Sequence, residues 1–586
     1  MEEEIGDDAL DIATETPTSR LANHLFSLLT TFLSAREKTV RFRATQLTSH
    51  IINSLDALDE ELYSSLRSNL LKRIRDKEAS VRVQAVIGLG RLAGNEEDDN
   101  GEGDSDDDEA GGLVARLLEI LQNDPSAEVR RTLLLNLSLT PSTLPYLLER
   151  ARDSDASTRK ALYSRLLPSL GDFRHLSLSM REKLLRWGLR DRDENVQKAT
   201  ARLFRERWID DCAGAGEHHE GESEEKSDSP NIDALLELLE RIDVINSGID
   251  EGIGGEAMKA FWDGRPDYRQ DVILDRTFWE NLTPESAFMA RTLNDFYHSA
   301  VDGDADLGDG KFPEITELAL YLQTYIDRLV DAFRANNNSD NDAEETTVET
   351  EFEIEQMLHI AKTLDYSDEI GRRKIFGLMR ETLAIGELPE GITQLVVDVL
   401  RDVCRGEESA EREFCSVVLE AISDLHDTIL GESSTVDNED ESFHSAKSEL
   451  DKDVIMNAKP SAKANTEEDS QIQDAKAIRE IVVNMKCLHI AQCMLQNVEG
   501  SLQSNVHLVA MLNNLVVPAV RSQEAPIRER GLLCMGLCCL LDKVRLTFQW
   551  FVLHLVELTL VLYRVWLKSI CTYSYTASRT DTTPYK

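Results

Sequence analysis

A short motif recurs along the N-terminal third of this sequence. Each copy has an Asp, then four residues, then Val or Thr, then Arg or Gln. Four copies align without gaps: "RDKEASVRVQAV" (75–86), "NDPSAEVRRTLL" (123–134), "RDSDASTRKALY" (152–163) and "RDRDENVQKATA" (190–201). Their aspartates are Asp76, Asp124, Asp153 and Asp191. A motif that returns after tens of residues predicts a stack of similar structural units.

Three weaker copies extend the pattern. They lie at 34–45, where Ala35 replaces the Asp, at 364–375, led by Asp365, and at 522–533, again without the Asp. The intervals between the first five copies are 41, 48, 29 and 38 residues, and the 48-residue interval contains an acidic insertion. These spacings suit helical hairpins.

The motif has a physical explanation as a helix–turn–helix unit. The Asp ends one helix and lies in the turn, and a Ser, Asp or Pro then opens the next helix, where carboxylates favour the helix N-terminus. The Val and a small residue four positions later point inward, and the Arg lies at the rim. We therefore predict an all-α fold, a HEAT-repeat α-solenoid with long acidic disordered loops. An irregular helical domain with chance similarity is the alternative.

One stretch also admits a strand. "VRVQAVIGLG" alternates apolar and polar residues. Val81, Ala85, Leu89 and Leu92 fit a helical face equally well, and the surrounding segments are long and lack hairpin turns. We expect a helix.

Acidic, polar stretches set the expected boundaries. We expect disordered segments at 1–18, 95–112, 210–231, 335–350 and 431–470, because their composition cannot bury apolar surface. HEAT repeats are expected at 19–94 and 113–209, central HEAT-like helices at 232–430 apart from the loop at 335–350, and a last helical segment at 471–543.

The formal net charge of −44 does not describe the predicted folded part. Nearly two-fifths of the 108 Asp and Glu residues lie in these five stretches. Between Arg20 and Arg207, without the 95–112 loop, roughly 30 Lys and Arg stand against roughly 20 Asp and Glu. The N-terminal array is therefore net basic, and a nucleic-acid partner is not excluded.

Two groups of basic residues are candidates for a surface that binds double-stranded DNA. The first is the dense cluster Lys72, Arg73, Arg75 and Lys77. The second follows the Val or Thr of the motif: Arg82, Arg130, Arg131, Arg159, Lys160 and Lys198. The second helices of successive units line the concave face of a solenoid, so repeated charges there form a stripe that can follow a phosphate backbone. For an Arg directly after the Val or Thr, the alternative is a ladder of hydrogen bonds to the Asp of the neighbouring repeat.

The sequence offers no motif for catalysis. It lacks G-x-x-x-x-G-K-[ST], G-x-S-x-G and H-E-x-x-H. We expect no enzyme activity, no cofactor and no small-molecule substrate. Asp191 and Asp193 fit helix capping better than acid–base chemistry, and His218 and His219 lie among carboxylates in a predicted loop, where a metal site is not expected.

The nine cysteines are scattered without regular spacing. The acidic N-terminus is the opposite of a secretory or mitochondrial leader, so we expect a reducing compartment. Cys534, Cys538 and Cys539 lie among apolar residues, and we expect them to fill a buried helix rather than to bind metal.

Longer segments resemble a known family. "LLKRIRDKEASVRVQAVIGLGRL", "STRKALYSRLLPSL" and "DFRHLSLSMREKLLRWGLRDRDENVQKATARLFRERWIDDC" closely resemble the HEAT-repeat, G-type non-SMC subunit of condensin (subunit 3), in a fungal form. "DALLELLERIDVINSGIDEGIGGEAMKAFWDGRPDY" and "NLTPESAFMARTLNDFY" resemble its middle region. Residues 485–543 resemble the start of its C-terminal domain.

This resemblance implies a non-enzymatic subunit that acts in mitotic chromosome condensation. It would bind the kleisin subunit along its solenoid and, with it, hold double-stranded DNA in a basic groove, while the SMC subunits of the complex hydrolyse ATP. By resemblance, "LLKRIRDK" lies at the N-terminal end of that groove. Nuclear and chromosomal localisation, with a cytoplasmic pool, is implied. The alternative is a transport-receptor solenoid that binds peptide cargo, against which "DFRHLSLSMREKLLRWGLRDRDENV" argues.

The resemblance ends at Lys543. Family members usually begin with further helices before Leu21 and continue well past this point. Residues 544–586 do not resemble the family, and we hypothesise that an unspliced intron encodes them. Leu546 to Leu562 approach the length of a membrane span, but Gln549, His554 and Glu557 interrupt them, so no membrane helix is expected.

Two dipeptides fit proline-directed kinases. Thr16-Pro17 and Ser229-Pro230 lie in predicted loops. Thr16 and Ser229 are therefore candidates for phosphorylation.

Overall fold

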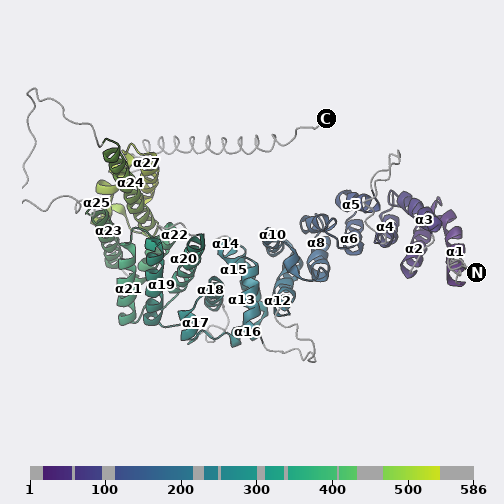
Figure 1. Ribbon diagram of the computed structural model, residues 1–586, viewed down its shortest axis with the longest axis horizontal. Helices are drawn as coiled ribbons and strands as arrows, with labels where there is room; N and C mark the ends of the chain where they lie inside the picture. The colour runs from purple at the N-terminus through teal and green to yellow at the C-terminus, as the bar shows by residue number, and fades with distance from the viewer. Residues whose placement is uncertain are drawn as a thin grey trace, which may run out of the picture. The chain divides into compact units, whose positions relative to one another are not determined.

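The computed structural model describes residues 17–55, 60–94, 112–214, 230–248, 252–299, 310–335, 341–405, 408–431 and 466–541. Every regular element in these ranges is a helix, which confirms the predicted all-α class. The chain divides into two units, Met1–Ile273 and Leu274–Lys586, called unit 1 and unit 2 (Figure 1).

Unit 1 begins with paired helices and continues with shorter ones. They are α1 (Pro17–Leu33), α2 (Lys38–Ser54), α3 (Glu60–Arg73), α4 (Ala79–Ala93), α5 (Leu113–Asn123), α6 (Ala127–Asn136), α7 (Leu144–Leu148), η1 (Glu149–Arg152), α8 (Ala156–Ala161), η2 (Leu162–Leu166), α9 (Leu167–Ser169), η3 (Phe173–His175), α10 (Leu178–Leu189), α11 (Glu194–Arg202), η4 (Leu203–Trp208), α12 (Ile209–Ala213), α13 (Ile232–Arg241), α14 (Val244–Ser247), α15 (Gly254–Gly264) and α16 (Pro266–Asp271).

The helices of unit 1 stack as the repeat predicts. The second helices of successive units, α2, α4, α6, α8 and α11, pack each against the next. The inward positions of the motif, Val81, Val129, Thr158 and Val196, are completely buried. The stretch that also admitted a strand lies within helix α4.

The aspartate of each motif shapes the turn between two helices. One Oδ1 atom accepts a hydrogen bond from the backbone N–H two residues later: Asp76 from Glu78 (3.1 Å), Asp124 from Ser126 (2.7 Å), Asp153 from Asp155 (2.9 Å) and Asp191 from Asp193 (2.8 Å). A short side chain that bonds to its own backbone favours a turn over continued helix. Asp193 caps α11 by accepting from the N–H of Asn195.

Unit 2 is built mainly from longer helices. They are α17 (Arg276–Glu280), α18 (Pro284–Ser299), α19 (Ile315–Ala335), α20 (Asn341–Ala361), α21 (Glu369–Leu383), α22 (Glu390–Val403), α23 (Glu408–Gly431), α24 (Thr466–Gln496), η7 (Leu502–Ser504), α25 (Val506–Met511), η8 (Leu512–Val516), α26 (Val517–Val520) and α27 (Ala525–Leu541). One layer runs α18, α20, α22, α24 and α27, and the other runs α19, α21, α23 and α25. One apolar core joins both layers.

The structure corrects several expected boundaries, and α1, for example, already begins at Pro17, within the segment 1–18 that was expected to be disordered. The loop predicted at 335–350 is wrong from Asn341 onward, where α20 begins. Thr347 and Thr350 are buried there, because the methyl group of a threonine can pack inside a helical layer although its hydroxyl makes the sequence look polar. Helix α12 also continues to Ala213, and α24 starts at Thr466, within segments expected to be disordered.

The cysteine prediction holds in part. Cys534 and Cys538 are buried in α27, and burial raises their thiol pKa values to about 11 and about 12. Cys539 is exposed, so its predicted burial is wrong, because it lies on the outer side of the same helix. Within the described ranges, no group of His, Cys, Asp or Glu side chains has the geometry to hold a metal ion.

Several predictions concern residues outside the described ranges. These are Thr16, Ser229, His218, His219 and the apolar stretch 546–562. Among the described helices, none is both long enough and apolar enough to cross a membrane.

The close contact between α10 and α11 yields a stability test. A Cβ atom on Gly188 would overlap Thr200 and Tyr163, whereas a Cβ atom on the exposed Gly255 would meet nothing within 4 Å. Gly188→Ala is therefore expected to lower the free energy of unfolding by about 1–3 kcal/mol. Gly255→Ala is the matched control and should leave stability unchanged or slightly raised. Urea unfolding measures both, and equal effects would contradict this packing.

Candidate nucleic-acid interface

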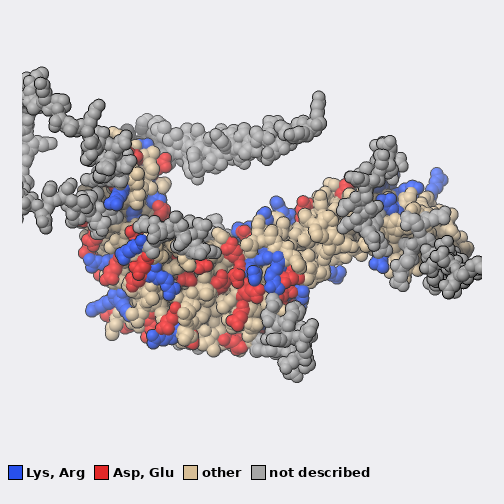
Figure 2. Space-filling model, in the orientation of Figure 1, with Lys and Arg blue, Asp and Glu red and all other residues tan. Residues whose placement is uncertain are grey.

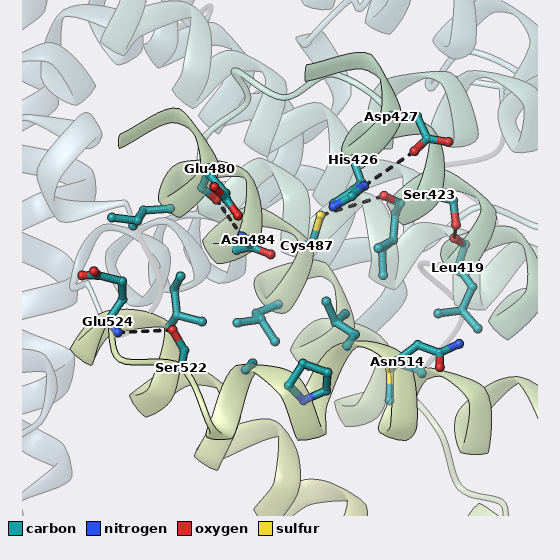
Figure 3. Close-up of a pocket in the computed structure, with 18 of the residues that line it drawn as sticks. Leu419, Ser423, His426, Asp427, Glu480, Asn484, Cys487, Asn514, Ser522 and Glu524 are labelled. Atoms are coloured by element: carbon teal, nitrogen blue, oxygen red, sulfur yellow. Dashed lines mark hydrogen bonds and ion pairs between the residues drawn. The ribbon is translucent and has the colours of Figure 1, made fainter. Parts of the chain in front are cut away.

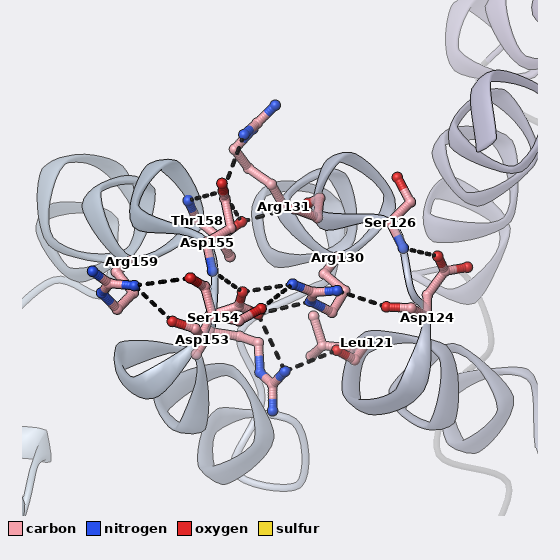
Figure 4. A network of polar contacts seen from close by, with 12 residues as sticks. Leu121, Asp124, Ser126, Arg130, Arg131, Asp153, Ser154, Asp155, Thr158 and Arg159 are labelled. Atoms are coloured by element: carbon pink, nitrogen blue, oxygen red, sulfur yellow. Dashed lines mark hydrogen bonds and ion pairs between the residues drawn. The ribbon is translucent and has the colours of Figure 1, made fainter.

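Successive repeats of unit 1 are joined by buried or partly buried arginine–aspartate pairs (Figure 4). Arg130 shows the geometry: Nε donates to Oδ2 of Asp153 at 2.8 Å and Nη2 donates to Oδ1 at 2.7 Å. Its Nη1 donates to the backbone oxygen of Asp124 at 2.6 Å. One guanidinium thus holds the turn of its own repeat and the aspartate of the next.

The same arrangement recurs at three other places. Arg41 pairs with Asp76, Arg82 with Asp124 and Arg159 with Asp191, in each case through Nε and Nη2 to the two carboxylate oxygens. We call these four pairs the ladder. It ends at Gln197, which donates only to the backbone oxygen of Asp191.

The weak copy at 522–533 keeps only half of the arrangement. Arg528 donates to the backbone oxygens of Ser522 (3.1 Å) and Gln523 (3.2 Å), as a ladder arginine does within its own turn.

The ladder fixes the charge state of its members. Burial raises the pKa of Asp153, but the hydrogen bonds from Arg130 and from the backbone of Asp155 outweigh it and leave this pKa below its ordinary value. The same balance, with Arg41 and Arg159 as donors, lowers the pKa values of Asp76 and Asp191. These three aspartates are therefore ionised at neutral pH, and their charges are compensated by the paired arginines.

Three candidate DNA-binding residues belong to this ladder. Arg82, Arg130 and Arg159 are buried, and their donors point at aspartates and backbone oxygens rather than at solvent. The geometry favours the structural alternative for them, so we leave them out of the proposed interface.

The dense cluster is placed differently. Lys72, Arg75 and Lys77 are exposed at the end of α3 and in the following turn, and they form no ion pair with a described residue. Arg73 is half-buried, and its Nη1 lies 3.2 Å from Oδ2 of Asp76. Three of the four side chains can therefore meet a partner, while Arg73 supports the turn.

The structure adds two basic residues that the sequence did not single out. Arg41 donates to the backbone oxygen of Arg36 (2.8 Å) while it holds Asp76, so the turn before α2 lies beside the turn before α4. Exposed Arg36 and Lys38 therefore lie near the turn that carries Arg75 and Lys77. The weak repeat copy at 34–45 is the sequence signal that could have placed them there.

In three successive copies, the motif position after the ladder arginine, or after Gln197 in the last copy, carries a basic residue. Arg131 is half-buried with Nη1 3.5 Å from Asp155, Lys198 is exposed with Nζ 3.3 Å from Glu194, and Lys160 is exposed without an ion pair to a described residue. These side chains lie on α6, α11 and α8, the successive second helices.

Positive charge is concentrated at the start of unit 1. The described residues of α1–α4 and their turns, 17–55 and 60–94, hold 12 Lys and Arg against 5 Asp and Glu. Figure 2 shows blue side chains with little red on the visible face of this end of the unit. Such a surface attracts phosphates without reading base sequence.

Comparison with known proteins shows a similarity to one named protein. Condensin complex subunit 3 of Schizosaccharomyces pombe is 37% identical over 519 residues, which are 87% of this chain and 53% of the relative. Over most of its length, this chain is similar to condensin complex subunit 3. The Saccharomyces cerevisiae protein of the same name is 31% identical over 86% of this chain and 49% of its own length.

Condensin comparisons also cover the fold. The crystal structure of the S. pombe condensin Cnd3-Cnd2 subcomplex matches with a TM-score of 0.67 and 34% identity, over 90% of this chain and 55% of that chain. The predicted α-solenoid is thereby confirmed. The chain spans about half the length of the curated relatives it matches.

One condensin signature reaches further than expected. The family described as "Nuclear condensing complex subunits, C-term domain" matches residues 486–557, past the expected end of the resemblance at Lys543.

The ladder predicts a pH-dependent loss of stability. Asp153→Ala leaves Arg130 buried without its partner and should cost about 3–5 kcal/mol in free energy of unfolding at pH 7. Glu182, which is half-buried and pairs with Arg186, serves as control, and Glu182→Ala should cost less than about 1 kcal/mol.

The sign of the pH effect follows from the lowered pKa of Asp153. Its contribution is complete above the ordinary aspartate pKa of about 3.9 and disappears as the pH falls through the lower folded-state value. The stability gap between the wild type and Asp153→Ala should therefore narrow only below about pH 4. A gap that is already closed at pH 6 would contradict this assignment.

Proposed function

We propose that this chain is a non-catalytic HEAT-repeat subunit of condensin that binds duplex DNA at the start of unit 1. The observation that carries the proposal is a group of exposed basic side chains: Lys72, Arg75 and Lys77, with Arg36 and Lys38 beside them. The neighbouring ladder arginines are already neutralised by aspartates, so these five residues provide uncommitted positive charge.

The mode of binding follows from the kind of residue present. Lys and Arg side chains on adjacent turns can each neutralise a phosphate of a duplex. Contacts of this kind position the protein on the backbone and carry no sequence information. The row Arg131, Lys160 and Lys198 would extend the contact along the second helices of later repeats.

The partner is proposed to be the kleisin subunit of the same complex. The similar S. pombe protein was crystallised as a Cnd3-Cnd2 subcomplex, and its match covers 90% of this chain. Through the kleisin, the chain would join the SMC ATPase subunits and act in mitotic chromosome condensation. Nuclear and chromosomal localisation, with a cytoplasmic pool, belongs to this proposal. The peptide-cargo alternative loses support, because the curated relatives at 31% and 37% identity are condensin subunits.

The DNA proposal is tested by salt dependence. Anisotropy of a fluorescent duplex is titrated with the full chain at several salt concentrations. Log affinity should fall linearly with log salt, and the triple variant Lys72→Glu, Arg75→Glu, Lys77→Glu should bind more weakly with a slope reduced by about 2–3.

A matched control separates the site from net charge. Arg276→Glu, Arg373→Glu and Arg405→Glu change the same number of charges on exposed side chains of unit 2. This control should retain the wild-type slope. The proposal fails if both triple variants reduce binding equally, or if the wild-type affinity does not respond to salt.

A further inference from the structure

Unit 2 contains a groove that the proposed DNA interface does not use (Figure 3). It lies between α23 and α24 on one side and the segment α25–η8–α26–α27 on the other, and its volume is about 840 Å³. Pockets that hold ligands or peptide side chains fall within about 300–1,000 Å³.

The floor of the groove is apolar. It is formed by Leu419, Ile422, Ile481, Met511, Leu515 and Ile527. Ile422, Met511 and Ile527 are buried and belong to the core of unit 2, while Ile481 and Leu515 are partly buried and pack against it. The floor is therefore fixed by the packing of four helical segments, and a ligand would meet a preformed apolar surface.

The charged residues of the rim are carboxylates, apart from one histidine. Asp427, Glu480 and Glu524 line the groove, and Lys and Arg are absent from the described lining. His426 lies at the same rim with Nδ1 3.6 Å from Asp427. Glu480 and Glu524 form no ion pair with a described residue, so their charge is available to a cationic partner.

Polar side chains between floor and rim can meet a peptide backbone. Asn484 donates Nδ2 to the backbone oxygen of Glu480 (2.8 Å), which leaves its carbonyl oxygen as an acceptor. Asn514 is exposed at the groove and forms no hydrogen bond with a described residue. The π-helical turn η8 that carries Asn514 is explained by Pro518, which has no backbone N–H to donate.

We propose that this groove docks a linear segment of a partner protein whose apolar side chains are flanked by Lys or Arg. The apolar floor would bind two or three apolar side chains of the segment. The carboxylates of the rim would attract the flanking Lys or Arg side chains and repel an acidic segment. The proposal does not depend on DNA binding, because no groove residue belongs to the basic cluster at the start of unit 1.

The probes are two labelled amphipathic peptides of about 16 residues, or roughly four helical turns. Both peptides have the same Leu/Ile face. All remaining positions are Lys in the first peptide and Glu in the second. Anisotropy with the full chain at physiological salt should show binding of the Lys peptide at least about tenfold tighter than that of the Glu peptide.

Three variants of the full chain locate the binding. Asn514→Trp fills the groove without changing net charge and should weaken Lys-peptide binding at least about tenfold. The triple reversal Asp427→Lys, Glu480→Lys, Glu524→Lys should do the same. The control Glu314→Lys, Glu381→Lys, Glu387→Lys reverses three exposed carboxylates away from the groove and should bind as wild type.

The competing occupants give distinct results. Equal binding by wild type and Asn514→Trp means adsorption to acidic surface and overturns the proposal. If deletion of residues 432–465 raises the affinity for the Lys peptide more than about tenfold, the groove is occupied by this segment of the same chain. If the wild type is a dimer and Asn514→Trp abolishes the dimer, the groove binds a second copy of the chain. Either result overturns the proposal. Duplex DNA binding should persist in every groove variant. A result that overturns peptide docking in the groove therefore does not contradict the proposed DNA binding by unit 1.

Discussion

Buried or partly buried arginine–aspartate pairs hold successive repeats of unit 1 in register. Each arginine bonds the backbone of its own turn and both carboxylate oxygens of the next repeat, as Arg130 does with Asp124 and Asp153. Apolar contacts between helices tolerate small slides, whereas a planar guanidinium facing a carboxylate accepts only one geometry. The ladder thus adds a directional constraint to helix stacking, and each pair is more valuable for register than for net stability, since two buried charges must first be desolvated.

The ladder also separates structural charge from binding charge. Arg82 and Lys77 lie close together in one turn, yet Arg82 has its donors occupied while Lys77 is exposed. Because the aspartates neutralise the ladder arginines, the positive potential of this surface comes from residues that have no structural task. A count of Lys and Arg along the sequence therefore overstates the positive charge that is free to meet a partner.

Much of unit 1 could be predicted from sequence, because the repeat encodes its own packing. The Asp-to-Val spacing places the turn and the buried position, and it suggested the ladder as an alternative for Arg82. The spatial neighbours of the basic cluster could not be predicted with the same ease, because Arg36 and Lys38 reach it only through the contact that Arg41 makes across repeats. The weak copy there lacks the Asp, so its sequence signal is poor.

Unit 2 resisted prediction for different reasons. The start of α20 reads as a polar loop, since the methyl groups of Thr347 and Thr350 are not visible in a composition count. The groove is formed by helices that lie apart in the sequence, among them α23, α24 and α27. No local sequence pattern therefore predicts it. Carboxylates that line a cavity together look, one by one, like ordinary surface residues.

The most direct test of the ladder is a double-mutant cycle on Arg82 and Asp124, which flank the 95–112 insertion in the sequence. Local opening free energies of α4 and α6 would be measured by hydrogen exchange for the wild type, Arg82→Met, Asp124→Leu and the double variant. A coupling energy of at least about 2 kcal/mol is predicted, with the double variant more stable than either single one. Additive effects, with coupling below about 0.5 kcal/mol, would show that the two side chains act independently and would contradict the ladder as the constraint that sets the repeats in register.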